Sequence, residues 1–158
     1  MYRAYKGAMT APNRRMLWLL ARAQRRVAAA SDVNLADLEL TSTQAGALFC
    51  FKDEGLLIGE LAAALDLAQS AASGLATRLE AASLVTRGEE KGDGRAARLR
   101  LTPAGKRKRD EAARRAISAN ADLLRGFTDR EADIVVRWLN QAADIATPAK
   151  RSRQKEKT

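Results

Sequence analysis

The sequence predicts a mainly helical fold of about six helices with one two-stranded antiparallel β-hairpin. Three observations support this fold class. The chain of 158 residues is long enough for one hydrophobic core and too short for two comfortable ones. Only 4% of its residues are aromatic, and alanine, leucine and arginine dominate, which favours helices over strands. Apolar residues recur at helical spacing in most segments, and they alternate in the period of a strand near one glycine-rich stretch.

The charge balance and the rare residue types narrow the classes of function. With 28 basic and 19 acidic residues the net charge is +9, which favours a polyanion such as nucleic acid as partner, with membrane headgroups and acidic proteins as alternatives. The chain has no histidine and one cysteine, so we expect no metal site, no cofactor and no enzymatic activity. No run of about 18 apolar residues is present, so we expect a cytoplasmic protein without a membrane partner.

The N-terminal third of the chain is predicted to contain an arm and two helices. The first ten or so residues have no firm periodicity and are expected to form an arm. Apolar residues then recur at helical spacing among arginines, which predicts an amphipathic helix that ends near Ser31. Thr41 and Gln44 form a capping box that opens a second helix through Phe51. This helix is expected to break at residues 53–55, where two acidic residues precede a glycine.

Two short helices in tandem come next. Apolar positions from Ile58 predict a third helix, and a second apolar stripe predicts a fourth helix that runs to about Ala82. Asp66 lies between them, and aspartate tolerates the left-handed backbone conformation that a tight turn often needs. The small residue Ala62 before the turn and the apolar positions from Ala72 after it match the packing needs of a helix-turn-helix.

A hairpin with basic side chains follows directly. Residues 84–86 are β-prone, residues 88–94 are rich in glycine, and residues 97–101 alternate between apolar and basic in the period of a half-buried strand. A hairpin immediately after a helix-turn-helix is a wing, so the predicted fold is a winged helix-turn-helix that binds DNA. The hairpin is expected to have a basic outer face, and the basic residues expected on the wing are Arg87, Lys91, Arg95, Arg98 and Arg100.

Two further helices complete the predicted fold. Thr102 caps a helix that has a proline at its first position and runs to about Arg125. A second capping box, from Thr128 to Glu131, opens the last helix. In the first of these helices the residues expected to face inward are Ala112, Ala113, Ala116, Ile117, Leu123 and Leu124. The apolar stripe of the last helix consists of Ile134, Val135, Trp138, Leu139, Ala142 and Ile145.

Six short motifs occur in a fixed order between residues 40 and 145. They are Leu40-Thr41-x-x-Gln44, Glu60-Leu61-Ala62, Arg78-Leu79-Glu80, Leu84-Val85-x-Arg87, Asp93-x-Arg95 and Leu101-Thr102-x-x-Gly105. Each motif is weak alone, but their common order and spacing are specific. Through these motifs the chain resembles the MarR family of bacterial transcriptional regulators.

The resemblance implies a mode of action. In that family the helix after the turn enters the major groove, the wing reaches the adjacent minor groove, and the first and last helices of each chain form a two-fold dimer. The chain is therefore expected to be a homodimeric repressor of a pseudo-palindromic operator on double-stranded DNA. Activation, and release from DNA by a small-molecule effector, stay open at this point.

The resemblance also implies a set of functional residues, with Arg95 as the wing-tip residue that Asp93 would hold. For the recognition helix they are Gln69, Ser70, Ser73, Thr77 and Arg78. For the wing they are Arg87, Lys91, Asp93, Arg95 and Arg98. For dimerisation they are Leu17, Trp18, Leu20, Ile134, Trp138 and Leu139.

The predicted organisation has four parts. Residues 1–39 form the N-terminal arm and a dimerisation helix, and residues 40–102 form the winged helix-turn-helix that binds DNA. Residues 103–147 form the C-terminal dimerisation helices. Residues 148–158 form a basic disordered tail, because they carry charge without an apolar stripe.

Two departures from the family pattern support a competing function. Ala68 and Gly74 stand where the family commonly has a capping serine or threonine and a basic residue. Residues 41–99 contain six basic and eight acidic residues, a net charge of −2, so the excess positive charge lies in the flanking segments. The alternative to a regulator is therefore a winged-helix interaction module, or a protein that coats DNA with weak base recognition.

Three other residues allow a functional and a structural interpretation. Cys50 is a candidate redox sensor, but its apolar neighbours favour a small buried hydrophobe. Trp18 and Trp138 could line an effector pocket, and burial in a core or a dimer interface is the more common role for tryptophan.

Overall fold

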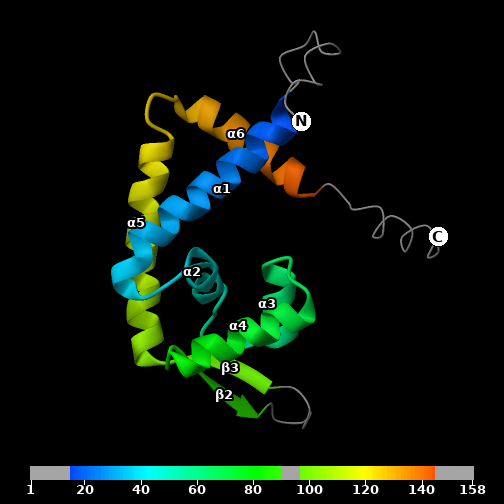
Figure 1. Cartoon of the computed structure of the whole chain (residues 1–158), viewed down its shortest axis with the longest axis vertical. Helices are drawn as coiled ribbons and strands as arrows, with labels where there is room; N and C mark the ends of the chain where they lie inside the picture. Colours follow the sequence, from blue (N-terminus) through cyan, green and yellow to red (C-terminus); the bar gives the residue numbers. More distant parts are fainter. Residues whose placement is uncertain (1–14, 90–96, 145–158) are drawn as a thin grey trace, which may run out of the picture. The chain divides into compact units, whose positions relative to one another are not determined.

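The computed structural model describes residues 15–89 and 97–144 (Figure 1). Within these ranges the chain forms six α-helices, one short 3-10 helix and three strands. The elements are α1 (Met16–Leu35), η2 (Ala36–Leu38), α2 (Ser42–Phe49), β1 (Leu56–Leu57), α3 (Ile58–Ala64), α4 (Gln69–Ala81), β2 (Val85–Glu89), β3 (Ala97–Leu101), α5 (Pro103–Leu123) and α6 (Asp129–Ala143). The chain divides into two compact units within α5, the first ending at Ala116 and the second beginning at Ile117.

Helix α1 is longer than the sequence predicted. It continues beyond Ser31 to Leu35, because the side chain of Leu35 is buried in the core of the first unit and extends the apolar pattern by one turn. The capping box of α2 is confirmed. The Gln44 backbone N–H donates to Thr41 Oγ1 at 3.2 Å, and the Thr41 backbone N–H donates to Gln44 Oε1 at 2.9 Å. Helix α2 ends at Phe49, two residues before the predicted end.

The helix-turn-helix consists of α3 and α4, which lie beside the sheet in Figure 1. Asp66 in the turn has a φ of 52°, so the predicted left-handed conformation is confirmed. One face of α4 is buried through Ala72, Leu75, Ala76 and Leu79. Burial of this face fixes the rotation of α4 about its axis and leaves the opposite face in solvent.

The sheet contains one strand more than the predicted hairpin. Its order is β1-β3-β2, and both pairs are antiparallel. Strand β1 escaped prediction because two residues are too few to display a period of two. Its Leu56 pairs with Leu99 of β3, and both side chains are buried. The third strand covers the edge of β3 that a hairpin alone would leave exposed.

The junction between β3 and α5 is closely packed. The Thr102 hydroxyl donates to the Ser83 carbonyl oxygen at 2.8 Å and accepts from the Gly105 backbone N–H at 2.9 Å. Gly105 is buried against the Leu84 carbonyl, where a side chain does not fit. These contacts explain why the last strand is followed by a threonine at position 102, which caps α5, and by a glycine at position 105, where there is no room for a side chain.

The second unit contains the end of α5 and the whole of α6. The capping box of α6 is confirmed, since the Thr128 backbone N–H donates to Glu131 Oε2 at 2.9 Å and Thr128 Oγ1 accepts from the Glu131 backbone N–H. The prediction that Ile117, Leu123 and Leu124 face inward is wrong for the single chain. Ile117 is 70% exposed and Leu123 is 57% exposed. In a unit of two helices, each helix can bury only the face that it turns toward the other. The apolar side chains on the remaining faces stay exposed unless another partner covers them.

Ala112 of α5 is buried as predicted, whereas Ala113 and Ala116 are half-buried. None of the residues of α6 is buried in the single chain. Ile145 and the basic tail lie outside the described residues, as does the N-terminal arm. In the part of the chain that the structure describes, no helix is both long enough and apolar enough to span a lipid bilayer.

Candidate nucleic-acid interface

The solvent face of α4 holds the predicted recognition residues. Gln69, Ser70 and Arg78 are exposed, and Ser73 is half-buried. Thr77 is exposed, but its hydroxyl donates to the Ser73 carbonyl oxygen at 3.1 Å, which leaves the hydroxyl oxygen as an acceptor for an outside donor. A rigid helix therefore presents a row of donors and acceptors from its first turn to its third.

The N-terminus of α4 has no side-chain cap. The N-cap residue Ala68 has an extended backbone, and its methyl side chain offers no acceptor to the first-turn N–H groups of α4. Ala68, Gln69 and Ser70 are all exposed. Uncapped N–H groups at the positive end of a helix attract an anion such as a phosphate. The missing cap is thus compatible with contact to a DNA backbone.

Gly74 also has a structural explanation. A Cβ atom at this position would lie 3.6 Å from a terminal guanidinium nitrogen of Arg78, so the Arg78 side chain folds back across Gly74. The charge of Arg78 therefore lies over the site where the family commonly carries a basic residue. Positions 74 and 78 are four residues apart, so they lie next to each other on the same face of the helix.

The strand register divides the basic residues of the wing between two faces. Arg100 pairs with Thr86 and Arg98 pairs with Gly88, so these four positions share the outer face of the sheet. Arg87 pairs with the buried Leu99 and belongs to the opposite face. Arg87 therefore lies in the wing but on a different face from Arg98 and Arg100, because successive residues of a strand alternate between faces.

Arg87 instead contacts the recognition helix. Its Nε lies 3.5 Å from Glu80 Oε2, and both side chains are partly exposed. The pair joins α4 to β2 and uses charge that the sequence analysis assigned to DNA. The predicted wing residues Lys91, Asp93 and Arg95 lie outside the described residues.

Two glycines provide room for the outer arginines. A Cβ atom at Gly88 would lie 3.2 Å from a terminal nitrogen of Arg100. A Cβ atom at Gly55 would lie 3.0 Å from Cγ of Arg100 and 3.2 Å from Cγ of Arg98. The aliphatic parts of both arginines therefore pack over glycine backbone, which restricts their side-chain conformations.

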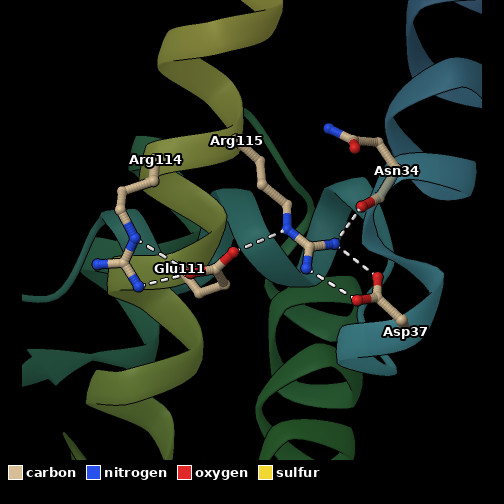
Figure 2. Close-up of polar contacts among 5 residues, drawn as sticks. All are labelled: Asn34, Asp37, Glu111, Arg114 and Arg115. Carbon is tan, nitrogen blue, oxygen red and sulfur yellow. Dashed lines mark hydrogen bonds and ion pairs between the residues drawn. The ribbon is translucent and has the colours of Figure 1, made fainter.

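A second group of charged residues lies at the end of α1, and sequence reasoning did not find it. Figure 2 shows Arg115 of α5 between Asp37 and Glu111. Its Nη1 donates to Asp37 Oδ1 at 2.5 Å and to the Asn34 carbonyl oxygen at 2.6 Å, and its Nη2 donates to Asp37 Oδ2 at 2.8 Å. Its Nε donates to Glu111 Oε1 at 3.1 Å. The guanidinium thus uses all three of its nitrogens, in the bidentate geometry that arginine forms with carboxylates.

A further ion pair lies on the same side of α5. Lys108 Nζ is 3.1 Å from Glu39 Oε2, in the connection between η2 and α2. Lys108 and Arg115 are seven residues apart, which places both on one face of the helix. The sequence analysis did not predict these contacts. The signal that could have revealed the contacts is the pair of acids at Asp37 and Glu39.

The hydrogen bonds from Arg115 lower the pKa of the Asp37 carboxyl below its usual value, and the hydrogen bonds from Arg114 and Arg115 do the same for Glu111. A carboxyl whose pKa is lower in the folded state stabilises the fold at pH values above its unfolded pKa. This contribution is lost as the pH falls through the folded pKa.

We therefore expect Asp37→Asn to lower the melting temperature by a constant amount between pH 5 and pH 8. The difference from the wild type should begin to shrink as the pH falls below about 4, the ordinary pKa of an aspartate, and should vanish below the lowered pKa of the folded state, where the wild-type carboxyl is neutral as well. Melting curves followed by circular dichroism measure this. Asp122→Asn is the matched control because Asp122 pairs only with nearby Arg125 on an exposed helix surface. A difference that does not shrink at all as the pH falls below about 4 would contradict the assignment.

The predicted dimerisation residues are mostly exposed in the single chain. Leu17 is 81% exposed, Trp18, Ile134 and Leu139 are between 41% and 49% exposed, and Leu20 and Trp138 are half-buried. The Arg22 guanidinium lies over the Trp18 ring, 5.2 Å from its centre, a typical cation–π contact.

The environment of Cys50 favours the structural interpretation. The thiol packs against the core of the first unit and donates to the Gly46 carbonyl oxygen at 3.3 Å. Burial raises the pKa of the Cys50 thiol, which disfavours the reactive thiolate.

A tandem helix pair, a polar helix face and an adjoining sheet with outward arginines define a winged helix-turn-helix protein. A model of the MarR family matches residues 38–96. No curated protein sequence matches the chain.

Solved structures resemble the chain over most of its length. A MarR-family transcriptional regulator from Rhodococcus sp. RHA1 has a TM-score of 0.76 and 25% identity, covering 87% of this chain and 99% of its own. CouR from Rhodococcus jostii RHA1, bound to p-coumaroyl-CoA, has a TM-score of 0.76 and 26% identity, covering 88% and 99%. MepR of S. aureus, in complex with DNA, has the same TM-score at 19% identity, covering 82% and 96%. The match to the MarR family model and these solved structures show that the chain is similar to MarR-family transcriptional regulators.

Proposed function

We propose that this chain binds double-stranded DNA as a homodimer, recognises a pseudo-palindromic operator and represses transcription. The observation that carries the proposal is the solvent face of α4. It combines the uncapped N-terminus at Ala68, the exposed side chains of Gln69 and Ser70, and the Arg78 guanidinium over Gly74. Amides and guanidinium groups read base edges in the major groove, and free backbone N–H groups bind phosphates.

The apolar surface of the single chain supports the homodimer. Leu17 and Leu19 are exposed near the start of α1, and Ile134, Val136 and Leu139 are exposed on α6. Exposed aliphatic side chains on two helices of a monomer favour association, because association removes their apolar surface from water. A symmetric dimer of these helices covers the surface and places two copies of α4 about 34 Å apart, in successive major grooves.

Release by a small molecule completes the proposed regulator. CouR, at 26% identity, was solved with p-coumaroyl-CoA bound, and this supports a small-molecule effector for the present chain as well. Repression is proposed to follow from occupancy of the operator in the cytoplasm, and loss of operator binding relieves it.

The experiment is selection of bound fragments from random double-stranded DNA, followed by affinity measurements on the enriched site. The wild type is expected to enrich an inverted repeat. Gln69→Ala should change the preferred base at one position of each half-site, because an amide reads a base edge. Arg78→Ala should weaken binding by roughly 10-fold or more. Arg95→Ala tests the wing tip that the sequence predicts, and it should weaken binding to all sequences alike.

Arg130→Ala removes an exposed arginine from the first turn of α6 and is the matched control for Arg78→Ala. It should leave both affinity and sequence preference unchanged. An enriched motif is absent if the protein is an interaction module or coats DNA without base recognition. That result, or unchanged binding in both α4 variants, rejects the proposal.

A further inference from the structure

Helix α1 is joined to the core of the first unit at one end. Of its residues, all of which the structure describes, only Leu35 is buried. The helix runs from Met16 to Leu35, and at 1.5 Å per residue its far end lies roughly 28 Å from this anchor. Such a helix acts as a lever, because a small rotation at Leu35 becomes a large displacement near Met16.

Polar contacts surround the anchored end. Arg115 of α5 donates to the Asn34 carbonyl oxygen in the last turn of α1, and it holds Asp37 of η2 through two parallel hydrogen bonds (Figure 2). The Ser42 backbone N–H at the start of α2 donates to Asp32 Oδ1 at 2.6 Å. Both neighbours of the last turn of α1, namely α5 and α2, are therefore attached to it by directional bonds.

Arg115 is suited to fix an angle as well as a distance. A planar guanidinium that binds a carboxylate through two nitrogens aligns the two groups, which a single ion pair does not. Its side chain is 24% exposed, so solvent screens it less than the neighbouring Arg114, which is 69% exposed and binds only Glu111. Within this group of residues, Arg115 alone joins α5 to both α1 and η2.

We propose that the contacts of Arg115 with Asp37 and Asn34, called here the Arg115 clamp, set the spacing of the operator half-sites that the dimer accepts. This inference rests on the proposed function, in which the exposed start of α1 contributes to the dimer interface. The clamp fixes the direction of α1 within the first unit, which also contains α4, and so fixes the separation of the two copies of α4 in the dimer. Arg115 is a positioning residue and touches no base.

The length of α1 gives the expected size of the change in half-site spacing. A rotation of about 10° at Leu35 moves the far end of α1 by roughly 5 Å. One base pair advances DNA by about 3.4 Å. A clamp that holds α1 to within a few degrees therefore discriminates between operators that differ by one base pair in spacing, and a loosened clamp does not.

The test uses the full chain and the operator enriched by the wild type, rebuilt with one or two base pairs added or removed between the half-sites. The wild type is expected to bind the native spacing at least about 10-fold more tightly than either neighbour. Asp37→Asn and Arg115→Lys should reduce this preference to about 3-fold or less. Their affinity for a single half-site should stay at the wild-type value. Arg114→Ala, the matched control, should keep the wild-type preference.

The variants separate a positioning role from a merely structural one. A loss of stability lowers the affinity for all spacings in proportion, whereas a loosened clamp flattens the dependence on spacing. Asp37 is 68% exposed, so Asp37→Asn keeps the core intact even if an Arg115 variant folds poorly. A wild-type spacing profile in Asp37→Asn and Arg115→Lys overturns the inference while the proposed function stands. Failure of the wild type to select an inverted repeat overturns the proposed function itself.

Discussion

Replacing Gly105 by alanine is expected to lower the free energy of unfolding by about 3 kcal/mol. The added Cβ would lie 2.0 Å from the Leu84 carbonyl oxygen and 3.2 Å from Cδ2 of Leu101. The carbonyl cannot move freely, since it accepts from the Thr102 backbone N–H at 3.0 Å. The first turn of α5 must therefore shift away from β2, which breaks the packing at the base of the wing. Urea unfolding followed by circular dichroism measures the loss.

Gly59→Ala is the matched control for this substitution. Gly59 also lies in the first turn of a helix, but a Cβ there meets no atom within 4 Å. Alanine should stabilise that helix by roughly 0.5 to 1 kcal/mol, since glycine is the poorer helix former. Two glycine-to-alanine changes of opposite sign would separate steric exclusion from helix propensity. A Gly105→Ala protein as stable as the wild type would contradict the close contact with Leu84.

Gly55→Ala is expected to have the second large effect, also about 3 kcal/mol or more. Gly55 has a φ of +89°, a conformation that costs an L-residue roughly 1 to 2 kcal/mol. In addition, its Cβ would lie 2.5 Å from the Leu99 carbonyl oxygen in the central strand of the sheet. The change should displace β1 and disturb the support of the two outer arginines, Arg98 and Arg100. Unfolding by urea gives the stability, and DNA affinity at low temperature gives the effect on the wing.

Gly126→Ala separates the two causes of this loss, namely backbone strain and the steric conflict with the Leu99 carbonyl. Gly126 has a φ of +88°, and a Cβ there would lie in open space. Backbone strain alone should then cost about 1 kcal/mol. The difference between the two alanine variants measures the steric conflict at Leu99. Equal losses in both would show that strain accounts for the whole effect at Gly55.

The local chemistry of the sequence was enough to predict most elements of the fold. The two capping boxes, at Thr41 and Thr128, are visible in sequence because their partners lie three residues away. The turn at Asp66 and the buried face of α4 follow from propensity and from the spacing of apolar residues. Signals of this kind involve neighbours along the chain, so they need no knowledge of tertiary contacts.

Apart from strand β1, which is too short to show a period, the features that the sequence did not predict depend on tertiary contacts. Leu35 extends α1 because it packs in a core formed by later segments. Arg115 pairs with Asp37 across 78 positions. The exposure of Ile117 depends on what covers a helix in the assembled protein. None of these follows from a periodic pattern.

The sequence by itself determined a winged helix-turn-helix with a polar recognition helix, because helix caps, periodicity and turn residues are local properties. The tertiary structure decided where the basic side chains lie and what they contact. It placed Arg78 over Gly74 and Arg100 on the outer face of the sheet, and it joined Arg87 to Glu80 and Arg115 to Asp37 in ion pairs. The reason is that an arginine side chain contacts whichever acceptor the fold brings near, and only the packed chain sets that distance.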